Sequence, residues 1–211
     1  SPDSSSLVAA GAGGIEVWDL ESFSMKSRLT RGDGGDYHVV LHPVTGAVVS
    51  SGSSGRLQIW DSAPQQCAST LCEDHGAWVV GLAPTQDGSG LITSDLAGGI
   101  RLWRLSDDTE IAYRNDVAGA ARTPAVSPDG SIVALGLGEG AVRLCSMRDL
   151  SDFRQLHHDT RAQVSAIAWS PDGRSIISGA TDGIAIIWNA ESGERRGELR
   201  IPAKTGSNEA V

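Results

Sequence analysis

The chain alternates short apolar runs with polar, glycine-rich stretches from its first residues to about residue 201. Several runs, such as IAIIW at 184–188, are apolar at consecutive positions, and no 3.6-residue apolar period continues over the length of a helix. Short apolar runs bounded by Gly, Asp and Ser predict β-strands joined by tight turns. Strands without alternation need cover on both faces of their sheet. The pattern therefore predicts an all-β fold in which sheets stack face to face.

One segment of this pattern occurs five times. Each copy has an apolar strand, a small-residue turn with Gly, a second strand and a large closing residue. The copies are LVAAGAGGIEVWD (7–19), VVSSGSSGRLQIWD (48–61), LITSDLAGGIRLWR (91–104), IVALGLGEGAVRLCS (132–146) and ISGATDGIAIIWN (177–189). The closing residues are Trp18, Trp60, Trp103, Cys145 and Trp188, at intervals of 42, 43, 42 and 43 residues. This register predicts five structural repeats.

A proline precedes each closing residue and serves as a second marker. The marker prolines are Pro2, Pro43, Pro84, Pro128 and Pro171, at 16, 17, 19, 17 and 17 residues before the closing position. Three of them stand in SPD, and Pro followed by Asp-Gly is typical of a type I turn. An apolar strand precedes four of the prolines, and a more polar run follows each closing residue. Each unit is therefore predicted to hold four short strands.

The period, the SPDG and DG turns and the terminal Trp-Asp pairs resemble those of WD-repeat β-propellers. The matching pairs are Trp18-Asp19, Trp60-Asp61 and Trp188-Asn189, whereas the third and fourth units end in Trp103-Arg104 and Cys145-Ser146 and depart from the pattern. The resemblance covers residues 1–201, and residues 202–211 are interpreted as a C-terminal tail. It implies an all-β propeller of four-stranded antiparallel blades.

The number of blades is a separate expectation. WD-repeat propellers are most often seven-bladed, which at this period requires about 300 residues. We therefore expect the five units to be the C-terminal part of a seven-bladed ring, with the other blades preceding residue 1 and the innermost strand of the first unit absent. A complete five-bladed ring and a ring completed by another chain are the alternatives.

The charge and cysteine content narrow the class of protein. A formal net charge of −9 argues against a nucleic-acid-binding surface and favours basic protein partners. No apolar run is long enough to span a membrane and no signal peptide is visible. Three cysteines, an odd number, favour a reducing, intracellular location, either cytoplasmic or nuclear. No spacing fits a zinc site, and no metal or cofactor is expected.

The fifth unit contains a set of residues that is capable of hydrolysis in a suitable geometry: His158 (or His157), Ser178 and Asp182. The resemblance implies a structural role instead. In WD repeats such a His bridges the turn Asp and a strand Ser, which in turn reaches the closing Trp, here Trp188. We favour the structural interpretation because these residues occupy the repeat's own positions, and a fluorophosphonate-reactive Ser178 would support the hydrolase.

The other units are expected to have lost most of this network. Their residues at the turn Asp position are Gly13, Ser54, Gly98 and Glu139. His75 in the third unit is expected to lack an Asp partner, because Asp95 does not align with that position. The glycine clusters at 11–14 and 136–140 are interpreted as hairpin turns rather than phosphate loops, because a strand follows each of them and not a helix.

The resemblance also implies where a partner binds. Strand residues around the mouth of the central channel commonly bind peptides in this family, and the acidic loops nearby suit a basic peptide. The candidate partner-binding residues are Tyr37, Trp78, Arg122 and Ser165, six residues before their marker prolines, together with Glu73 and Asp74 in a loop.

The predicted function is therefore a non-catalytic scaffold for protein–protein interactions within a multi-protein complex. Two further non-catalytic functions remain alternatives. One is a sensor or autoinhibitory propeller domain of a larger signalling protein, and the other is a chaperone-like binder of a basic client.

Overall fold

A computed structural model describes residues 1–201 apart from 12, 30–36, 62–66, 73–74 and 116–122. The regular elements of this described part are nineteen β-strands. They form five antiparallel sheets, here called blades 1 to 5 in chain order.

The blades follow the chain without crossovers. Blade 1 contains β1 (Ser6–Gly11), β2 (Gly14–Asp19) and β3 (Met25–Leu29). Blade 2 contains β4 (Tyr37–Leu41), β5 (Val48–Gly52), β6 (Leu57–Trp60) and β7 (Cys67–Cys72). Blade 3 contains β8 (Val79–Pro84), β9 (Gly90–Asp95), β10 (Ile100–Arg104) and β11 (Thr109–Arg114). Blade 4 contains β12 (Thr123–Val126), β13 (Ile132–Gly136), β14 (Ala141–Ser146) and β15 (Asp152–His157). Blade 5 contains β16 (Val164–Trp169), β17 (Ser175–Ala180), β18 (Ile184–Asn189) and β19 (Arg195–Arg200).

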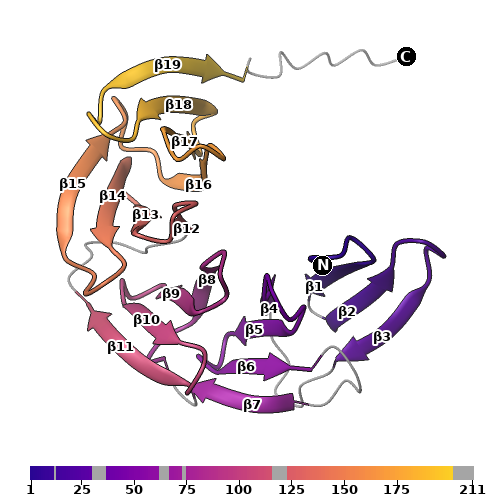
Figure 1. Ribbon diagram of the computed structural model, residues 1–211. Coiled ribbons are helices and arrows are strands. Elements are labelled where there is room, and N and C mark those ends of the chain that lie inside the picture. Colours follow the sequence, from indigo (N-terminus) through magenta and orange to yellow (C-terminus); the bar gives the residue numbers. More distant parts are fainter. Residues whose placement is uncertain (12, 30–36, 62–66, 73–74, 116–122, 202–211) are drawn as a thin grey trace, which may run out of the picture.

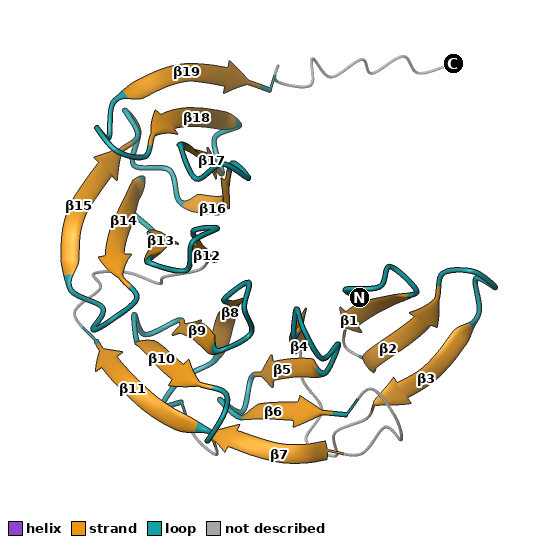
Figure 2. Ribbon diagram, viewed as in Figure 1, coloured by secondary structure: helices purple, strands orange, loops and turns teal. Residues whose placement is uncertain are grey.

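The five blades are arranged around an arc, with β4, β8, β12 and β16 on its inner side and β7, β11, β15 and β19 on its outer rim (Figure 1). Figure 2 shows strands and connecting loops throughout the arc. The prediction of an all-β propeller with antiparallel blades is confirmed. Blade 1 differs from the others in having three strands.

The consecutive apolar residues of the strands are explained by packing between blades. Val48 of β5 belongs to a core shared with blade 1, whereas the next residue, Val49, belongs to a core shared with Leu91 and Trp103 of blade 3. Adjacent strand residues point to opposite faces, so a sheet between two neighbours buries both sets. Each internal blade therefore lacks a polar face.

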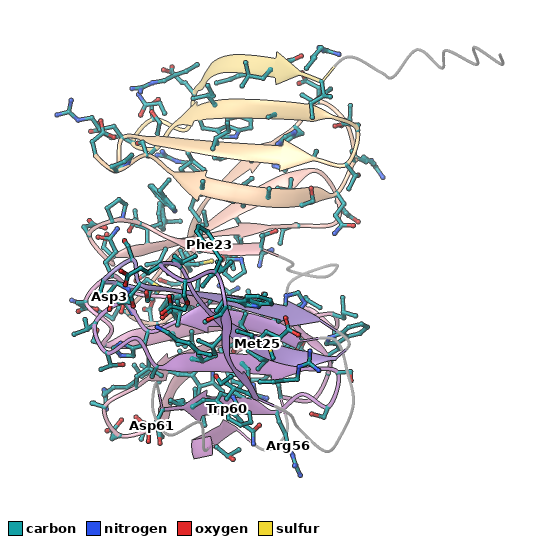
Figure 3. The ribbon with its side chains drawn as sticks, turned by 90° about the vertical axis from the view of Figure 1, so that its right-hand side faces the viewer. Asp3, Phe23, Met25, Arg56, Trp60 and Asp61 are labelled. Carbon is teal, nitrogen blue, oxygen red and sulfur yellow. The ribbon has the colours of Figure 1, made fainter. Side chains whose placement is uncertain are left out.

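Equivalent positions on the outward faces of the two end blades are exposed. Leu7 of β1 is 53% exposed, but Val48, which has the same place in blade 2, is 3% exposed. Figure 3 looks onto the blade 1 end of the arc, where Phe23 and Met25 are 80% and 46% exposed. Blade 5 exposes Ile177 in the same way. The end blades therefore present surfaces that a neighbour covers elsewhere in the arc.

The turn after the innermost strand has one geometry in blades 3 and 4. In blade 4 the Gly130 amide donates to the Ser127 carbonyl at 2.9 Å, with Gly130 at a φ of 72°. In blade 3 the Gly88 amide donates to the Thr85 carbonyl at 3.0 Å.

This equivalence corrects the predicted marker of the third unit. The turn runs from Thr85 to Gly88, and its second position is Gln86, whereas Pro84 is the last residue of β8. The separation from Gln86 to Trp103 is 17 residues, as in the other four-stranded blades. Pro84 therefore lies two residues before Gln86, the position that corresponds to the marker prolines of the other four-stranded blades.

Candidate functional site

The most complete polar network of the described residues is buried in blade 3. His75 Nδ1 lies 2.9 Å from Asp95 Oδ2, and His75 Nε2 lies 2.7 Å from Thr93 Oγ1. The indole Nε1 of Trp103 donates to the same Thr93 oxygen at 2.9 Å. The Thr93 hydroxyl accepts from the indole and donates to Nε2, so Nδ1 carries a proton for Asp95. All four side chains are buried.

Asp95 also holds the turn that follows β9. Its Oδ1 accepts the amides of Ala97 at 2.9 Å and Gly99 at 2.7 Å. A side chain at Gly99 would collide with this carboxylate, so Gly is required there. The Asp95 carboxylate therefore holds both the turn and His75. Through His75 it is also linked to Thr93 of β9 and Trp103 of β10.

The expectation that His75 lacks an Asp partner is wrong. Thr93 and Ser178 are equivalent because each accepts from the Trp of its blade, which makes Asp95 equivalent to Ala180 and not to Asp182. The misalignment of Asp95 with the turn position was correctly predicted. Asp95 is the last residue of β9, and in the folded chain its carboxylate nevertheless contacts His75.

Blade 5 has a shorter network than the sequence predicts. The indole of Trp188 donates to Ser178 Oγ at 2.8 Å, and His158 Nε2 lies 2.8 Å from the same oxygen. Nδ1 of His158 is buried and has no hydrogen-bond partner among the described residues. Asp182 accepts instead from the Thr160 hydroxyl and from the Ile184 amide at 3.0 Å. The expected Asp182–His158 hydrogen bond is therefore absent from this structure.

The closing residues of the remaining blades have other partners. Trp60 donates to Ser50 Oγ at 2.8 Å, which is the Trp–hydroxyl part of the network. Trp18 donates to Glu16 of its own strand at 3.1 Å. In blade 4 the Cys145 thiol occupies the position and donates to Asp152 Oδ1 at 3.1 Å. Burial is the main cause that raises the pKa of Cys145 above its ordinary value, so this thiol stays protonated.

The network geometry favours a structural role over hydrolysis. Ser178 is 0% exposed, and its oxygen is occupied by the Trp188 indole and the imidazole of His158. Burial is the main cause that lowers the pKa of both His75 and His158, which favours neutral rings. A buried serine that supports an indole offers no surface to a substrate. No group of three or more metal-binding side chains occurs in the described ranges.

The candidate partner-binding residues are described only in part. Arg122, Glu73 and Asp74 and the side chain of Tyr37 lie outside the described residues. Ser165 is exposed, and its hydroxyl donates to the Gly179 carbonyl at 3.4 Å.

Trp78 is half-buried, and its indole nitrogen is buried without a hydrogen-bond partner in the described part of the chain. Its carbonyl accepts the Leu96 amide at 3.0 Å, as the Gln163 carbonyl accepts the Thr181 amide at 2.9 Å in blade 5. Trp78 therefore corresponds to Gln163 and not to Ser165, which corresponds to Val80 at the bulge of β8. The displaced marker Pro84 caused this error.

Comparison with known proteins agrees with the repeat pattern. Residues 151–189 match the family model described as WD domain, G-beta repeat. The WD repeat and HMG-box DNA-binding protein 1 of Xenopus laevis is 29% identical over 87% of this chain and 17% of its own length. The Protein LST8 homolog of Drosophila pseudoobscura pseudoobscura is 25% identical over 95% of this chain and 67% of its own length. The nuclear distribution protein nudF of Aspergillus niger is 21% identical over 86% of this chain and 45% of its own length.

Radially arranged antiparallel blades, each closed by a residue anchored to a polar group, define the molecule as a β-propeller protein. The family-model match at residues 151–189 and the WD-repeat relatives support a WD-repeat family for this chain. It spans only about a sixth of the first of these relatives, 17% of its length. No helix in the described part of the chain is long and apolar enough to span a lipid bilayer.

Proposed function

We propose that this chain is a non-catalytic platform on which other proteins or peptides assemble. One observation carries the proposal: His75 of blade 3 and His158 and Ser178 of blade 5, the residues best suited to base or nucleophile chemistry, lie inside the blades. His75 and His158 hold their networks together, and Ser178 supports an indole. Side chains used in this way stiffen a scaffold and leave recognition to its loops.

The relatives support a role in larger assemblies or larger chains. A chain of this length makes up 17% of the WD repeat and HMG-box DNA-binding protein 1, so this relative contains much further sequence. This favours a second candidate function, in which the propeller is a sensor or autoinhibitory module of a larger protein. Proteins are the proposed partners in both cases, inside the cell and without direct nucleic-acid binding.

The proposed partner surface is the edge of the arc that carries the His-containing loops. We place there the candidate residues Tyr37, Trp78, Arg122, Ser165, Glu73 and Asp74. Ser165 is the described and exposed member of this set. A long charged side chain at this position is expected to obstruct a docked partner, with little effect on packing.

Affinity capture with purified chain, quantified by mass spectrometry, tests this function. The comparison is between the unchanged chain, Ser165→Arg on the proposed surface and Arg196→Glu on the outer strand β19, as a charge-changing control. A set of proteins lost with Ser165→Arg and retained with Arg196→Glu would support the proposal. Equal capture by all three chains would contradict this surface.

A separate arm tests for hydrolysis. The chain is treated with a fluorophosphonate probe, and Ser178→Ala serves as the control. No labelling of the unchanged chain is expected, because Ser178 is buried. Labelling that Ser178→Ala abolishes would overturn the non-catalytic assignment.

A further inference from the structure

The edge of the arc opposite the His-containing loops has a groove between blades 4 and 5. Its volume is about 380 Å³, near the lower end of the size range of ligand pockets. The turns at 127–130 and 170–173 line it together with Ala190 and Glu191, which follow β18. A groove of this size accommodates one long side chain with its flanking backbone.

An aromatic side chain forms one wall of the groove. Trp169, at the end of β16, is half-buried, and its Nε1 donates to the Ala125 carbonyl of β12 at 2.9 Å. This hydrogen bond crosses from blade 5 to blade 4 and fixes the indole between them. Pro128 and Ile132 of blade 4 and Pro171 of blade 5 add further apolar lining.

Only blade 5 has this aromatic residue among the four blades with a described innermost strand. The equivalent residues before the turn are Leu41, Pro84 and Val126 in blades 2, 3 and 4. The repeat itself does not require Trp169, because three blades fold with other residues there. A residue that departs from the repeat is a candidate for function.

The charged side chains at the rim of the groove are acidic. Asp129, Asp172 and Glu191 line it, and no cationic side chain is part of the described lining. Hydrogen bonds from the hydroxyls of Ser127 and Ser170 are the main causes that lower the pKa values of Asp129 and Asp172. Both carboxyl groups are therefore charged at neutral pH.

Two arginines adjoin the groove without lining it. The guanidinium of Arg154 donates to the backbone carbonyls of Ala190 and Glu191, so its hydrogen bonds are directed at the turn. Arg174 follows the turn of Asp172 and helps to lower the pKa of that carboxyl group. These charges moderate the acidic rim, and they favour a ligand with one cationic group over a highly basic one.

We propose that this groove binds one arginine side chain of a partner peptide. The aliphatic stem would pack against Pro128 and Ile132, and the planar guanidinium would lie against Trp169 and within reach of the rim carboxylates. The site deepens the proposed function, on which it rests, by naming the chemistry of one partner. It lies on the edge of the arc opposite the surface tested by Ser165→Arg.

Titration of the isotope-labelled chain with acetyl-Gly-Gly-Arg-Gly-Gly-amide tests the site by NMR. The citrulline peptide is the matched control, because it keeps the shape of the side chain and removes its charge. Shifts are expected at the Gly130 and Gly173 amides and the Trp169 indole, with the arginine peptide binding about fivefold or more tightly than the citrulline peptide. Equal binding of the two peptides, or shifts confined to other parts of the chain, would overturn the proposal.

Two neighbouring acidic residues provide a matched pair of variants. Glu191→Gln removes a rim charge and is expected to weaken the arginine peptide about two- to fivefold. Glu194→Gln changes the same charge three residues away, outside the groove lining, and is expected to leave the affinity unchanged. Trp169→Val, the residue type found in blade 4, should weaken both peptides. Equal affinities for the two Gln variants would contradict the proposed site.

Peptide binding at the groove and partner capture, measured together, distinguish a failure of the arginine site from a failure of the proposed platform function. Loss of peptide binding with intact, Ser165-dependent partner capture would reject the groove and leave the platform in place. Peptide binding at the groove without captured partners would support the groove and reject the proposed partner surface.

Discussion

His75 Nδ1 lies 2.9 Å from Asp95 Oδ2 inside blade 3, whereas Nδ1 of the equivalent His158 in blade 5 meets no hydrogen-bond partner within the ranges that the structure describes. The two histidines otherwise have the same environment, with Nε2 next to a strand hydroxyl that accepts from the closing Trp. Blade 3 therefore holds the complete four-residue network, and blade 5 holds three of its four members. We therefore expect the network in blade 3 to contribute more to the free energy of unfolding than the network in blade 5.

Replacing the two aspartates should have unequal effects on stability. Asp95→Ala leaves the buried His75 donor and the buried Gly99 amide without an acceptor, at a cost of about 2–4 kcal/mol in the free energy of unfolding. Asp182→Ala removes contacts of an exposed carboxylate and should lower the free energy of unfolding clearly less than Asp95→Ala does. Urea unfolding of both variants measures the difference. Equal losses would show that Asp182 shares the buried network after all.

Stability should decrease when the pH falls below the ordinary histidine pKa. Burial lowers the pKa values of His75 and His158 in the folded chain. Below about pH 6.5 the unfolded chain therefore binds protons that the folded chain excludes, so the free energy of unfolding decreases. The midpoint of urea unfolding should be lower at pH 5.5 than at pH 7.5.

A histidine variant and the titration range of two carboxyl groups provide the controls for this pH dependence. His158→Asn should reduce the difference between pH 7.5 and pH 5.5, because one of the two groups is removed. Asp129 and Asp172 have lowered pKa values, so their contribution is present above about pH 3.8 and is lost only in more acidic solution. A stability that rises from pH 7.5 to 5.5 would contradict the buried neutral histidines.

Two glycines with the same backbone conformation should differ in their tolerance of a side chain. Gly130 and Gly140 have φ values of 72° and 73°, so Ala is strained at either position. A Cβ at Gly140 would in addition collide with the Thr160 backbone, whereas nothing lies within 4 Å at Gly130. Gly140→Ala should cost about 2–4 kcal/mol, and Gly130→Ala about 1 kcal/mol. Thermal unfolding compares the two, and similar losses would reject the close approach of Thr160.

The thiol of Cys145 should be inert in the folded chain. It is 1% exposed and its pKa is raised, so little thiolate is present and reagents cannot reach it. In a Cys67→Ser, Cys72→Ser background, Ellman's reagent should react with Cys145 only after urea is added. Rapid reaction without urea would show that blade 4 opens at this position.

The repeat made the fold predictable from the sequence. The closing residues recur at nearly constant intervals, and strands such as the one at 184–188 (IAIIW) have apolar residues on both faces, a combination that requires blades packed on both sides. The Trp188–Ser178–His158 contacts followed from the family resemblance. The error at Pro84 arose because this residue, directly before the turn, was taken for the second residue of the turn, which is Gln86.

What the sequence by itself determined is the repeat, the antiparallel blades and the opposite packing of neighbouring residues such as Val48 and Val49, because these depend on local spacing and alternation. Only the tertiary structure decided which carboxylate meets which histidine. Asp95 contacts His75 from the end of a strand, whereas Asp182 accepts a hydrogen bond from Thr160. These partners depend on ångström-scale positions of segments about 20 residues apart in the chain. The groove beside Trp169 likewise requires two blades to be placed side by side, which no single repeat specifies.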